Sequence, residues 1–497
     1  MSDRPQPKAA QPGAVQPAAV RNFVRDFVEL QPRGGVAAVT VSASEGRRVW
    51  TFAELAGAAA ALTGVFASHG VRRGSTVLTL LGHRVEYVLS ILACLRMGAA
   101  VLPCSEQLRP KDLELRLRQA RPALVVCDVR NRAVLDEAAP DCPVIDVGDG
   151  IATPRGAPAP AVDLGPTDPA FVLFTSGTSG EPKLVTHGQR YVWGQRLQAR
   201  DWLGARPGEL VWSSAAPGWS KSARNTFIAP WLCGARALLQ DARFDPSERL
   251  ATMRREQVNV LCMAPTEYRL IAAHGPIENV PSLRRLVTAG EPLGSAATQT
   301  WREQTGLVIA DGYGQTETGH LAGVRPGREA PAGSMGLPLP GIVMELVDGE
   351  LTVDPQTVPT FFLGYGGEPV PAGPWHTGDR VRQDEHGWLY FEARVDDVIL
   401  SAGYRIGPAE VELALSGHPA VREVAVIGVP DATRGEIVTA VVVLREGYVG
   451  SDKLVADLQA HAKAETAPYK YPRQVSFVDA LPKTTSGKIH RAALRQP

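Results

Sequence analysis

Residues 175–183 form the densest group of side chains in this chain that could do chemistry. Two threonines and two serines supply four hydroxyls, two glycines lie among them, and Lys183 ends the stretch. Small residues let a backbone curl so that several N–H groups point at one anion, and the hydroxyls and ammonium add donors and charge. The pattern predicts a polyphosphate loop, although it lacks the G-x-x-x-x-G-K-[ST] spacing of a Walker A loop. Taken alone, the stretch fits a flexible surface turn better than a phosphate loop.

A second loop, residues 311–319, is also dense in glycine and hydroxyls and carries one carboxylate. Tyr313 could stack on a base, Thr316 could bond a phosphate, and Glu317 could hold Mg²⁺, which prefers oxygen ligands. The alternative for this loop is a solvated turn.

Three more polar residues occupy comparable positions further along the chain. Asp379 follows a glycine turn, and a carboxylate is suited to accept hydrogen bonds from ribose hydroxyls. Arg405 is flanked by glycines and could clamp a phosphate, and Lys488 ends a polar loop near the C-terminus. Singly, these residues fit an Asx-turn, a hairpin turn and a solvated charge. Five such stretches in one chain favour a shared site.

The elements that must position these loops alternate between strands and helices. We expect strands at residues 77–81, 99–103 and 123–127, separated by helices at residues 85–97 and 111–119, and a parallel doubly wound sheet from that order. Phosphate sites in such sheets lie at the carboxyl ends of strands, and residues 170–174 form an apolar strand directly before the first loop.

The remaining chain divides into three parts. A second αβ series spans residues 190–308, and short β runs with glycine turns at residues 331–391 predict a small β-barrel or meander. The αβ pattern then resumes, and we place a domain boundary between Arg394 and Val395. We therefore expect a disordered tail at residues 1–21, an N-terminal domain at 22–394 and a C-terminal domain at 395–497.

Composition narrows the functional classes. Lys+Arg and Asp+Glu are both 52, so the zero net charge gives no global electrostatic case for nucleic acid or anionic membrane. The six cysteines form no C-x-x-C pair, which is typical of buried thiols in a reducing compartment. No apolar run reaches the ~18 residues needed to span a bilayer. We expect a cytoplasmic protein without nucleic-acid partners or integral membrane association.

At the five polar stretches the sequence resembles the adenylate-forming enzymes, which include acyl-CoA synthetases, peptide-synthetase adenylation domains and luciferases. The resemblance covers the chain from Asn22 onward. Shorter strings are similar to medium-chain acyl-CoA synthetases in particular: residues 94–98 (CLRMG), 183–187 (KLVTH), 216–221 (APGWSK), 230–231 (PW), 264–269 (APTEYR), 401–408 (SAGYRIGP) and 467–473 (APYKYPR).

The resemblance implies an α/β fold, with a large N-terminal domain of two doubly wound αβ subdomains plus a small β-barrel, and a mobile α+β C-terminal domain. It implies an ATP-dependent acid–thiol ligase that turns a medium-chain, branched or aryl carboxylic acid into acyl-AMP and then into acyl-CoA, with Mg²⁺ held by Glu317. Catalysis is assigned to Lys488, Thr316 and Glu317. ATP and AMP binding is assigned to Thr175, Ser176, Gly177, Thr178, Ser179, Gly180, Glu181, Pro182, Lys183, Gly290, Glu291, Pro292, Asp311, Gly312, Tyr313, Gly314, Gln315, Asp379, Arg394 and Arg405.

The same resemblance assigns the second substrate, the acyl pocket and the hinge. In the family the small domain rotates between the two half-reactions about a hinge, which is Asp396 here. CoA binding is assigned to Ala402, Gly403, Tyr404, Arg434, Lys463 and Tyr471, and the acyl pocket to Trp219, Tyr268, Thr288, Ala289 and Gly336.

Two departures and two alternatives accompany this assignment. Ala393 stands where relatives usually have glycine, and Leu400 replaces a polar residue near the hinge. Of the family's steps, these departures bear on the domain rotation. One alternative passes the acyl group to a carrier-protein phosphopantetheine or an amine instead of CoA. The other is a nucleotide-binding protein that does not catalyse. A carrier protein and a second copy of the chain are left open as partners.

Overall fold

The structure is a computed structural model. It describes residues 22–42, 46–147, 157–175, 182–277, 280–291, 293, 295–401, 404–431, 433–466, 469–483 and 489–495. The tail expected at residues 1–21 lies outside this part of the chain.

The first sheet has eight strands in the order β20-β19-β8-β7-β4-β3-β5-β6. Its middle strands, such as β3, are apolar runs buried along nearly their whole length, which is typical of parallel strands covered on both faces. The strands are β3 Thr76–Leu80, β4 Ala100–Cys104, β5 Leu124–Asp128, β6 Val144–Val147, β7 Pro169–Phe174, β8 Leu184–Gly188, β19 Gly364–Tyr365 and β20 Glu368–Pro369.

This sheet is mixed, whereas the alternation of strands and helices predicted a parallel one. The strands β3 to β7 pair in parallel, but β8 runs antiparallel to β7 and continues into antiparallel β19 and β20. The cause is the short connection, because β7 ends at Phe174 and β8 begins at Leu184, which leaves fewer residues than the crossover that a parallel pair requires.

The second sheet has seven strands in the order β13-β12-β11-β9-β10-β1-β2, all parallel except the edge strand β2. Its strands are β1 Val36–Ser42, β2 Gly46–Thr51, β9 Leu210–Ser213, β10 Arg236–Asp241, β11 Val260–Cys262, β12 Arg285–Val287 and β13 Ile309–Ala310.

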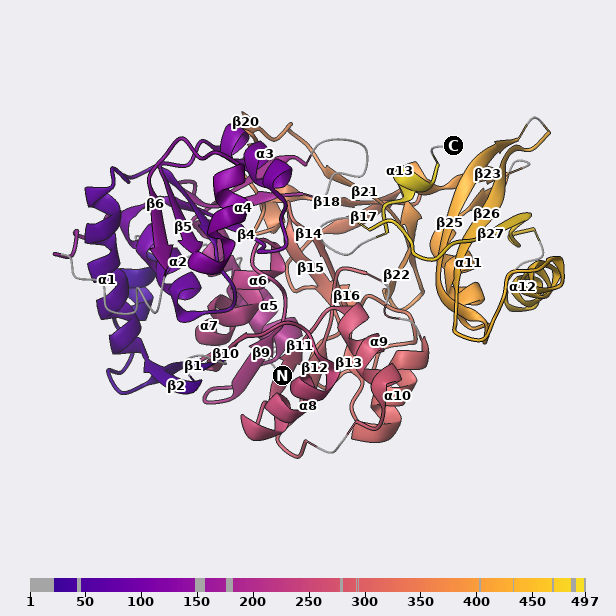
Figure 1. The fold of residues 1–497 in the computed structure, drawn as a ribbon, viewed down its shortest axis with the longest axis horizontal. Helices are drawn as coiled ribbons and strands as arrows, with labels where there is room; N and C mark the ends of the chain where they lie inside the picture. Colours follow the sequence, from indigo (N-terminus) through magenta and orange to yellow (C-terminus); the bar gives the residue numbers. More distant parts are fainter. Residues whose placement is uncertain are drawn as a thin grey trace, which may run out of the picture.

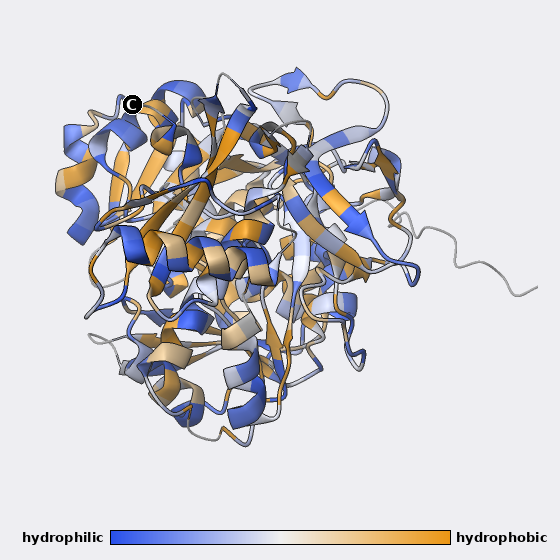
Figure 2. Ribbon diagram, turned by 90° about the vertical axis from the view of Figure 1, so that its right-hand side faces the viewer, coloured by the Kyte–Doolittle hydropathy of each residue, from blue (hydrophilic) through white to orange (hydrophobic). Residues whose placement is uncertain are grey.

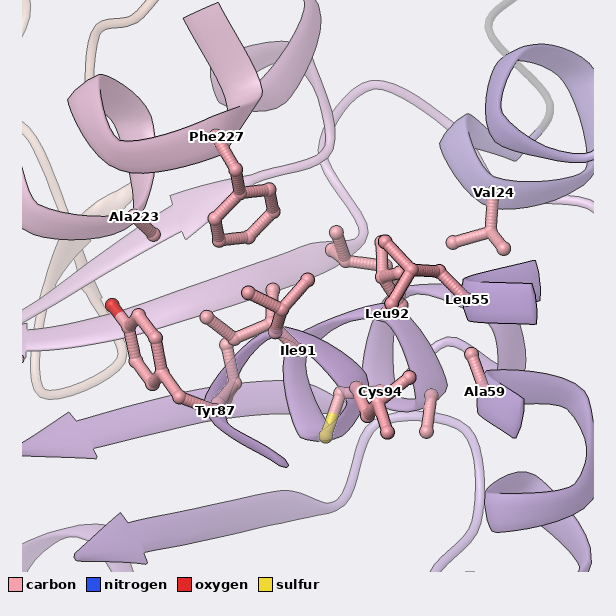
Figure 3. Packing of buried hydrophobic residues seen from close by; sticks show 14 of the residues in the cluster. Val24, Leu55, Ala59, Tyr87, Ile91, Leu92, Cys94, Ala223 and Phe227 are labelled. Carbon is pink, nitrogen blue, oxygen red and sulfur yellow. The ribbon is translucent and has the colours of Figure 1, made fainter. Parts of the chain in front are cut away.

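Helix α2 lies between the two αβ units and is buried on nearly every face. The sequence predicts a helix at residues 85–97, and α2 has these bounds. Figure 3 shows Ile91 and Leu92 of α2 between Leu55 of α1 and Phe227 of η4. The sequence predicts a capping box at Thr51, because Glu54 follows three residues later. Helix α1 begins with this box, since Glu54 N donates to Thr51 Oγ1 at 3.2 Å and Thr51 N donates to Glu54 Oε2 at 2.8 Å.

The other helices cover the sheets and the small domain. The α-helices are α1 Phe52–Ser68, α2 Val85–Met97, α3 Pro110–Ala120, α4 Arg132–Glu137, α5 Arg190–Gln198, α6 Lys221–Ala223, α7 Ala229–Leu232, α8 Pro246–Arg255, α9 Pro265–His274, α10 Ser295–Thr305, α11 Pro408–Ser416, α12 Asp452–Glu465 and α13 Arg491–Leu494. The π-helical turns are η1 Val24–Val28, η3 Ala199–Leu203 and η4 Arg224–Ile228, and the 3₁₀ turns are η2 Val129–Asn131, η5 Pro355–Thr357 and η6 Val395–Asp397.

Two small antiparallel sheets follow. The second occupies the region where short β runs were expected, whereas the first comes mostly from residues before it and includes part of the segment 311–319 that was expected to be a loop. The first has the order β14-β15-β16, and the second β17-β18-β21-β22. Their strands are β14 Gly312–Gln315, β15 Gly319–Gly323, β16 Leu337–Pro338, β17 Met344–Val347, β18 Glu350–Val353, β21 Trp375–Gln383 and β22 Leu389–Arg394.

The C-terminal segment builds its own sheet and core, as the α+β prediction requires. The sheet contains β23 Ile399–Ser401, β24 Tyr404–Ile406, β25 Val421–Asp431, β26 Gly435–Leu444 and β27 Gln474–Phe477, and the buried cluster packed on it draws only on residues from Ile399 onward. Figure 1 shows this segment (yellow) at one end of the molecule, joined to the rest beside β22. The chain boundary between the two domains stays a prediction.

Hydrophobic residues are concentrated on the strands, and hydrophilic ones on loops and outer helical turns (Figure 2). Among the helices that the structure describes, none is long and apolar enough to cross a bilayer.

Candidate active site

A buried carboxylate, Asp379 on β21, joins three of the predicted site elements. Its Oδ2 accepts hydrogen bonds from Tyr313 Oη at 2.5 Å and Gln315 Nε2 at 2.8 Å. Its Oδ1 accepts from Arg394 Nη1 at 2.8 Å, because the register of β21 and β22 places Asp379 directly opposite Arg394. The structure therefore brings the loop at residues 311–319, the ribose candidate and its arginine together.

The two uncharged donors to Asp379 are themselves held in position. Burial raises the pKa of Tyr313 well above its ordinary value, and the nearby Asp379 charge raises it further, so the phenol keeps its proton and donates. Gln315 Nε2 also donates to the Thr377 carbonyl at 2.7 Å, and its Oε1 accepts from Trp375 Nε1 at 3.1 Å.

The polar loop after β7 closes at its base. Thr175 N donates to the Lys183 carbonyl at 3.0 Å, and Lys183 N donates to Thr175 Oγ1 at 3.3 Å. The predicted residues Ser176, Gly177, Thr178, Ser179, Gly180 and Glu181 lie outside the described part of the chain, while Pro182 is described.

An aromatic side chain that sequence reasoning did not single out, Tyr365 on β19, connects this loop to the carboxylate of Glu317. Lys183 Nζ lies 5.2 Å from the centre of the Tyr365 ring, and Tyr365 Oη donates to Glu317 Oε1 at 2.8 Å. Burial and the Glu317 charge raise the pKa of Tyr365, which keeps this donor protonated. The ammonium of the first loop and the carboxylate of the second thus share one neighbour.

His187 lies on β8, the strand that follows the first loop, and contacts the second loop. Its Nε2 lies 2.7 Å from the Thr316 carbonyl, so this nitrogen must carry a proton. The ring packs against Tyr191 with centroids 4.1 Å apart. Burial lowers the pKa of His187 to about 3, which makes it a neutral, structural donor at physiological pH.

Glu291, which was predicted to bind the nucleotide, is held by hydrogen bonds within the protein. Glu291 Oε1 accepts from Thr266 N at 2.8 Å and from Arg269 Nη2 at 3.3 Å, which engages its carboxylate with the start of α9. Gly290 has φ +109°, a conformation that favours glycine. Pro292 lies outside the described residues.

The acyl candidates separate into two groups. Trp219 lines a narrow, mostly aromatic and apolar pocket, and the other residues around this pocket are Tyr87, Pro103, Phe171, Leu173, Tyr191, Ser220 and Ala223. Sequence reasoning missed these, since they come from distant elements. Lys221 contacts both Trp219 and a second acyl candidate, Ala289.

The other acyl candidates hold the backbone in the structure. Tyr268 is fully buried, and its Oη donates to the carbonyls of Leu261 at 3.0 Å and Val287 at 3.2 Å, which ties β11 to β12. Thr288 Oγ1 donates to the Met263 carbonyl at 2.8 Å. Gly336 has φ +99° and packs against the backbone of Gly323. The acyl roles of these residues stay predictions.

In the C-terminal segment, the CoA candidates Lys463 and Tyr471 lie together. Lys463 Nζ is 4.0 Å from the centre of the Tyr471 ring, and Arg473, which was not predicted, donates from Nη1 to Tyr471 Oη at 3.0 Å. The backbone N of Arg434, a third CoA candidate, donates to Asp431 Oδ1 at 2.8 Å.

Tyr404 stacks on Tyr469 with ring centroids 4.2 Å apart. Ala402, Gly403 and Lys488 lie outside the described residues, and Asp396 and Arg405 are described by their backbone alone. The loop that carries Lys488 closes at its described ends, through a bridge between Lys483 and Ile489.

Asp311 generates a prediction about pH. Burial raises the pKa of its carboxyl to about 7, although the Gly312 N–H at 2.8 Å and the charge of Lys221 oppose the rise. A carboxyl with a raised folded-state pKa costs no stability below its ordinary value of 3.8, and the cost grows as pH rises towards 7. We expect Asp311→Asn to remove this cost. Its free energy of unfolding relative to the parent protein should therefore rise by up to about 4 kcal/mol between pH 4 and pH 7 and stay level above.

Denaturant unfolding at several pH values measures this difference, with the exposed Asp479→Asn as a matched control. A difference that is flat across this range, or that falls with pH, would contradict the burial argument for Asp311.

Comparisons with known proteins agree with this geometry. The family model for AMP-binding enzymes matches residues 27–374, and the model for the AMP-binding enzyme C-terminal domain matches residues 410–488. The chain is 35% identical to an uncharacterized acyl–CoA ligase of Bacillus subtilis (strain 168), covering 96% of each protein. It is also 35% identical to a mitochondrial acyl-coenzyme A synthetase of Homo sapiens, covering 90% of this chain and 83% of the relative.

Two solved structures share the fold over nearly the whole chain. One is an anthranilate CoA ligase in complex with anthranoyl-AMP, with a TM-score of 0.86 and 27% identity over 96% of this chain and 97% of that one. The other is a benzoate CoA ligase from Burkholderia xenovorans LB400, with a TM-score of 0.85 and 26% identity over 96% of this chain and 100% of that one.

Proposed function

The chain belongs to the AMP-binding enzyme family, and on that premise we propose how its residues carry out the reaction of an AMP-forming acid–thiol ligase. The enzyme activates a carboxylic acid with ATP to acyl-AMP and then transfers the acyl group to CoA. The observation that carries our residue assignment is the buried junction at Asp379, which gathers Tyr313, Gln315 and Arg394 around one carboxylate.

In the first half-reaction a carboxylate oxygen attacks the α-phosphorus of ATP, the bond to the bridging oxygen breaks, and pyrophosphate leaves. Two anions must approach each other, so nearby positive charge and N–H donors lower the barrier. We assign the leaving phosphates to the loop closed by Thr175 and Lys183, whose hairpin base is preformed. Lys488 would bridge the carboxylate and the α-phosphate, and Thr316 would bond a phosphate.

The residues present fit a magnesium ion. Glu317 is a partly exposed carboxylate beside the phosphate loop, and the described residues contain no cluster of three acidic, histidine or cysteine side chains that would form an all-protein cage. Mg²⁺ is usually held by one or two carboxylates together with substrate phosphates. Glu317 would hold the ion, which would neutralise charge on the leaving phosphates when bound.

The nucleotide would lie across the Asp379 junction. Asp379 and Arg394 would hold the ribose, and Tyr313 would stack on adenine opposite the segment of Gly290, Glu291 and Pro292. Tyr313 is supported in that role because its hydroxyl is bonded to Asp379, which sets the ring angle. We assign a phosphate contact to Arg405.

In the second half-reaction the sulfur of CoA attacks the activated carbonyl, and AMP leaves. We propose that the small domain turns about Asp396, withdraws Lys488 and presents Ala402, Gly403 and Tyr404. Ion pairs support movement of this domain as one body. Arg491, just after the Lys488 loop, pairs with Glu412 at 2.7 Å, and Arg495 pairs with Asp397 beside the hinge at 2.9 Å.

For the acid we propose a medium-chain, branched or aryl carboxylate. The narrow pocket beside Trp219 is lined by the buried side chains of Tyr87, Phe171, Leu173 and Tyr191, which would give such a tail apolar and aromatic contacts once they move apart to admit it. Two proteins that share this fold, an anthranilate CoA ligase and a benzoate CoA ligase, support the aryl option.

For the acceptor we favour free CoA over a carrier-protein phosphopantetheine or an amine. The exposed cations Lys463 and Arg473 on the Tyr471 ring suit the phosphates and adenine of CoA, which a carrier protein would not present. A carrier protein, a homodimer and a cytoplasmic location stay predictions.

A panel of acids tests this function. Linear acids from acetate to dodecanoate, a branched set and benzoates are incubated with ATP and Mg²⁺, with and without CoA. We expect AMP, pyrophosphate and acyl-CoA in equal amounts with medium-chain, branched or aryl acids. Acid-dependent pyrophosphate exchange without acyl-CoA would favour the carrier-protein alternative. Release of ADP, or no exchange with any acid, would contradict the proposal.

Two substitutions should separate the half-reactions. Lys488→Ala should lower the rate of acid-dependent pyrophosphate release by about 10²- to 10³-fold, because it removes a cation from the transition state. Transfer from supplied acyl-AMP to CoA should partly survive in this variant. Gly403→Leu should do the reverse, because a bulky side chain would block the approach of the thiol.

Exposed positions on the same chain serve as controls, namely Lys453→Ala and Gly57→Leu, where a new side chain meets no neighbour. Equal loss of both half-reactions in Lys488→Ala, or normal CoA turnover in Gly403→Leu, would refute the respective role.

A further inference from the structure

Tyr365, on the short strand β19, holds Glu317 from a distant segment of the chain. Its Oη donates to Glu317 Oε1 at 2.8 Å, and the nearby Phe362 N donates to the Glu317 carbonyl at 2.8 Å. Residues 362–365 therefore engage both the side chain and the backbone of Glu317. In the proposed function Glu317 would hold Mg²⁺, so Tyr365 contacts the residue on which the ion depends.

The position of Tyr365 is fixed by the backbone and by a neighbouring ring. Strand β19 pairs with β8, the strand that follows the polar loop. A methyl group added at Gly364 would collide with the carbonyl oxygen of Glu368, so the tight backbone before the tyrosine requires glycine. The Tyr365 ring packs edge-on against Phe362, with ring centroids 4.9 Å apart. These contacts aim the hydroxyl at Glu317 before any ligand is bound.

A positive charge lies against the same aromatic ring. Lys183 Nζ, at the end of the polar loop, is 5.2 Å from the centre of the Tyr365 ring. An aromatic face stabilises an ammonium without neutralising it. Tyr365 thus contacts the proposed metal ligand through its hydroxyl and a proposed phosphate ligand through its ring.

We infer that Tyr365 is a positioning residue that orients the Glu317 carboxylate for Mg²⁺. The inference rests on the proposed function, since it takes Glu317 as the residue that holds the ion. Carboxylates that bind metal ions are themselves held by hydrogen bonds, and loss of such an outer partner weakens metal binding by about 10- to 100-fold. The donation to Oε1 would fix the carboxylate in this way and leave Oε2 for the ion.

A role in packing alone would have a different signature. Loss of packing weakens every nucleotide complex, with or without metal, whereas loss of an orienting hydrogen bond weakens only the complex with Mg²⁺. Tyr365→Phe keeps the ring and removes the hydroxyl, so it separates the two roles. Tyr390→Phe is a matched control, because Tyr390 Oη also donates to a carboxylate, Asp384 Oδ2, at 3.0 Å and lies outside the candidate site.

Calorimetric binding of the α,β-methylene analogue of ATP, with Mg²⁺ and in EDTA, tests the inference without turnover. Mg²⁺ should tighten binding of the analogue by the parent enzyme. In Tyr365→Phe we expect this tightening to fall by at least about 10-fold, while the affinity in EDTA changes less than about twofold. In a Glu317→Ala background Tyr365→Phe should have no further effect, because the hydroxyl acts through that carboxylate. Tyr390→Phe should match the parent enzyme.

Three results would overturn the inference. Mg²⁺ could tighten binding equally in the parent enzyme and in Tyr365→Phe, or in neither. The affinity of Tyr365→Phe could fall as far in EDTA as with Mg²⁺, which would make the tyrosine a packing residue. The substitution could also weaken the Mg²⁺ complex as strongly in the Glu317→Ala background as in the parent enzyme.

Pyrophosphate release by the parent enzyme keeps this inference separate from the proposed function. Acid-dependent release, together with any of those three results, would overturn the role of Tyr365 alone. Failure of every acid to release pyrophosphate would instead remove the proposed function, and with it this role.

Discussion

The rest of the structure depends on the compensation of one buried charge. Asp379 is removed from water, and a buried anion is tolerated only where donors surround it. Tyr313, Gln315 and Arg394 supply those donors from β14 and β22, so the nucleotide loop and the last strand of the large domain cannot shift independently. Since β22 runs directly into η6, the same contact fixes where the predicted hinge begins.

Neutral, buried groups extend this arrangement to Thr316 and Glu317, the residues proposed to bind phosphate and Mg²⁺. His187 and Tyr365 keep their donor protons because burial opposes ionisation of each, and both connect β8 or β19 to the Thr316–Glu317 turn. In the proposed function, these contacts would hold the ATP site together within the large domain. The small domain would then deliver Lys488 and later withdraw it.

The sequence predicted elements and loops better than contacts between them. The capping box at Thr51 and the bounds of α2 depend on neighbouring residues, and both are confirmed. The antiparallel β8 was missed because a loop rich in glycine and serine gives no sign of whether the chain crosses over or turns back. Tyr365 and His187 were given no role, since their partners lie far away in sequence, and residue type alone does not reveal that Tyr268 points to backbone carbonyls.

The central claim of the proposed function is that Asp379 accepts hydrogen bonds from the ribose hydroxyls of the nucleotide. The most direct measurement compares kcat/KM for ATP and 2′,3′-dideoxy-ATP in acid-dependent pyrophosphate release, in the parent enzyme and in Asp379→Asn. The parent enzyme should prefer ATP by about 10- to 100-fold, since hydrogen bonds to a charged acceptor are lost with the hydroxyls, and the variant should show little preference. Equal use of both nucleotides by the parent enzyme, or an undiminished preference in the variant, would contradict this account.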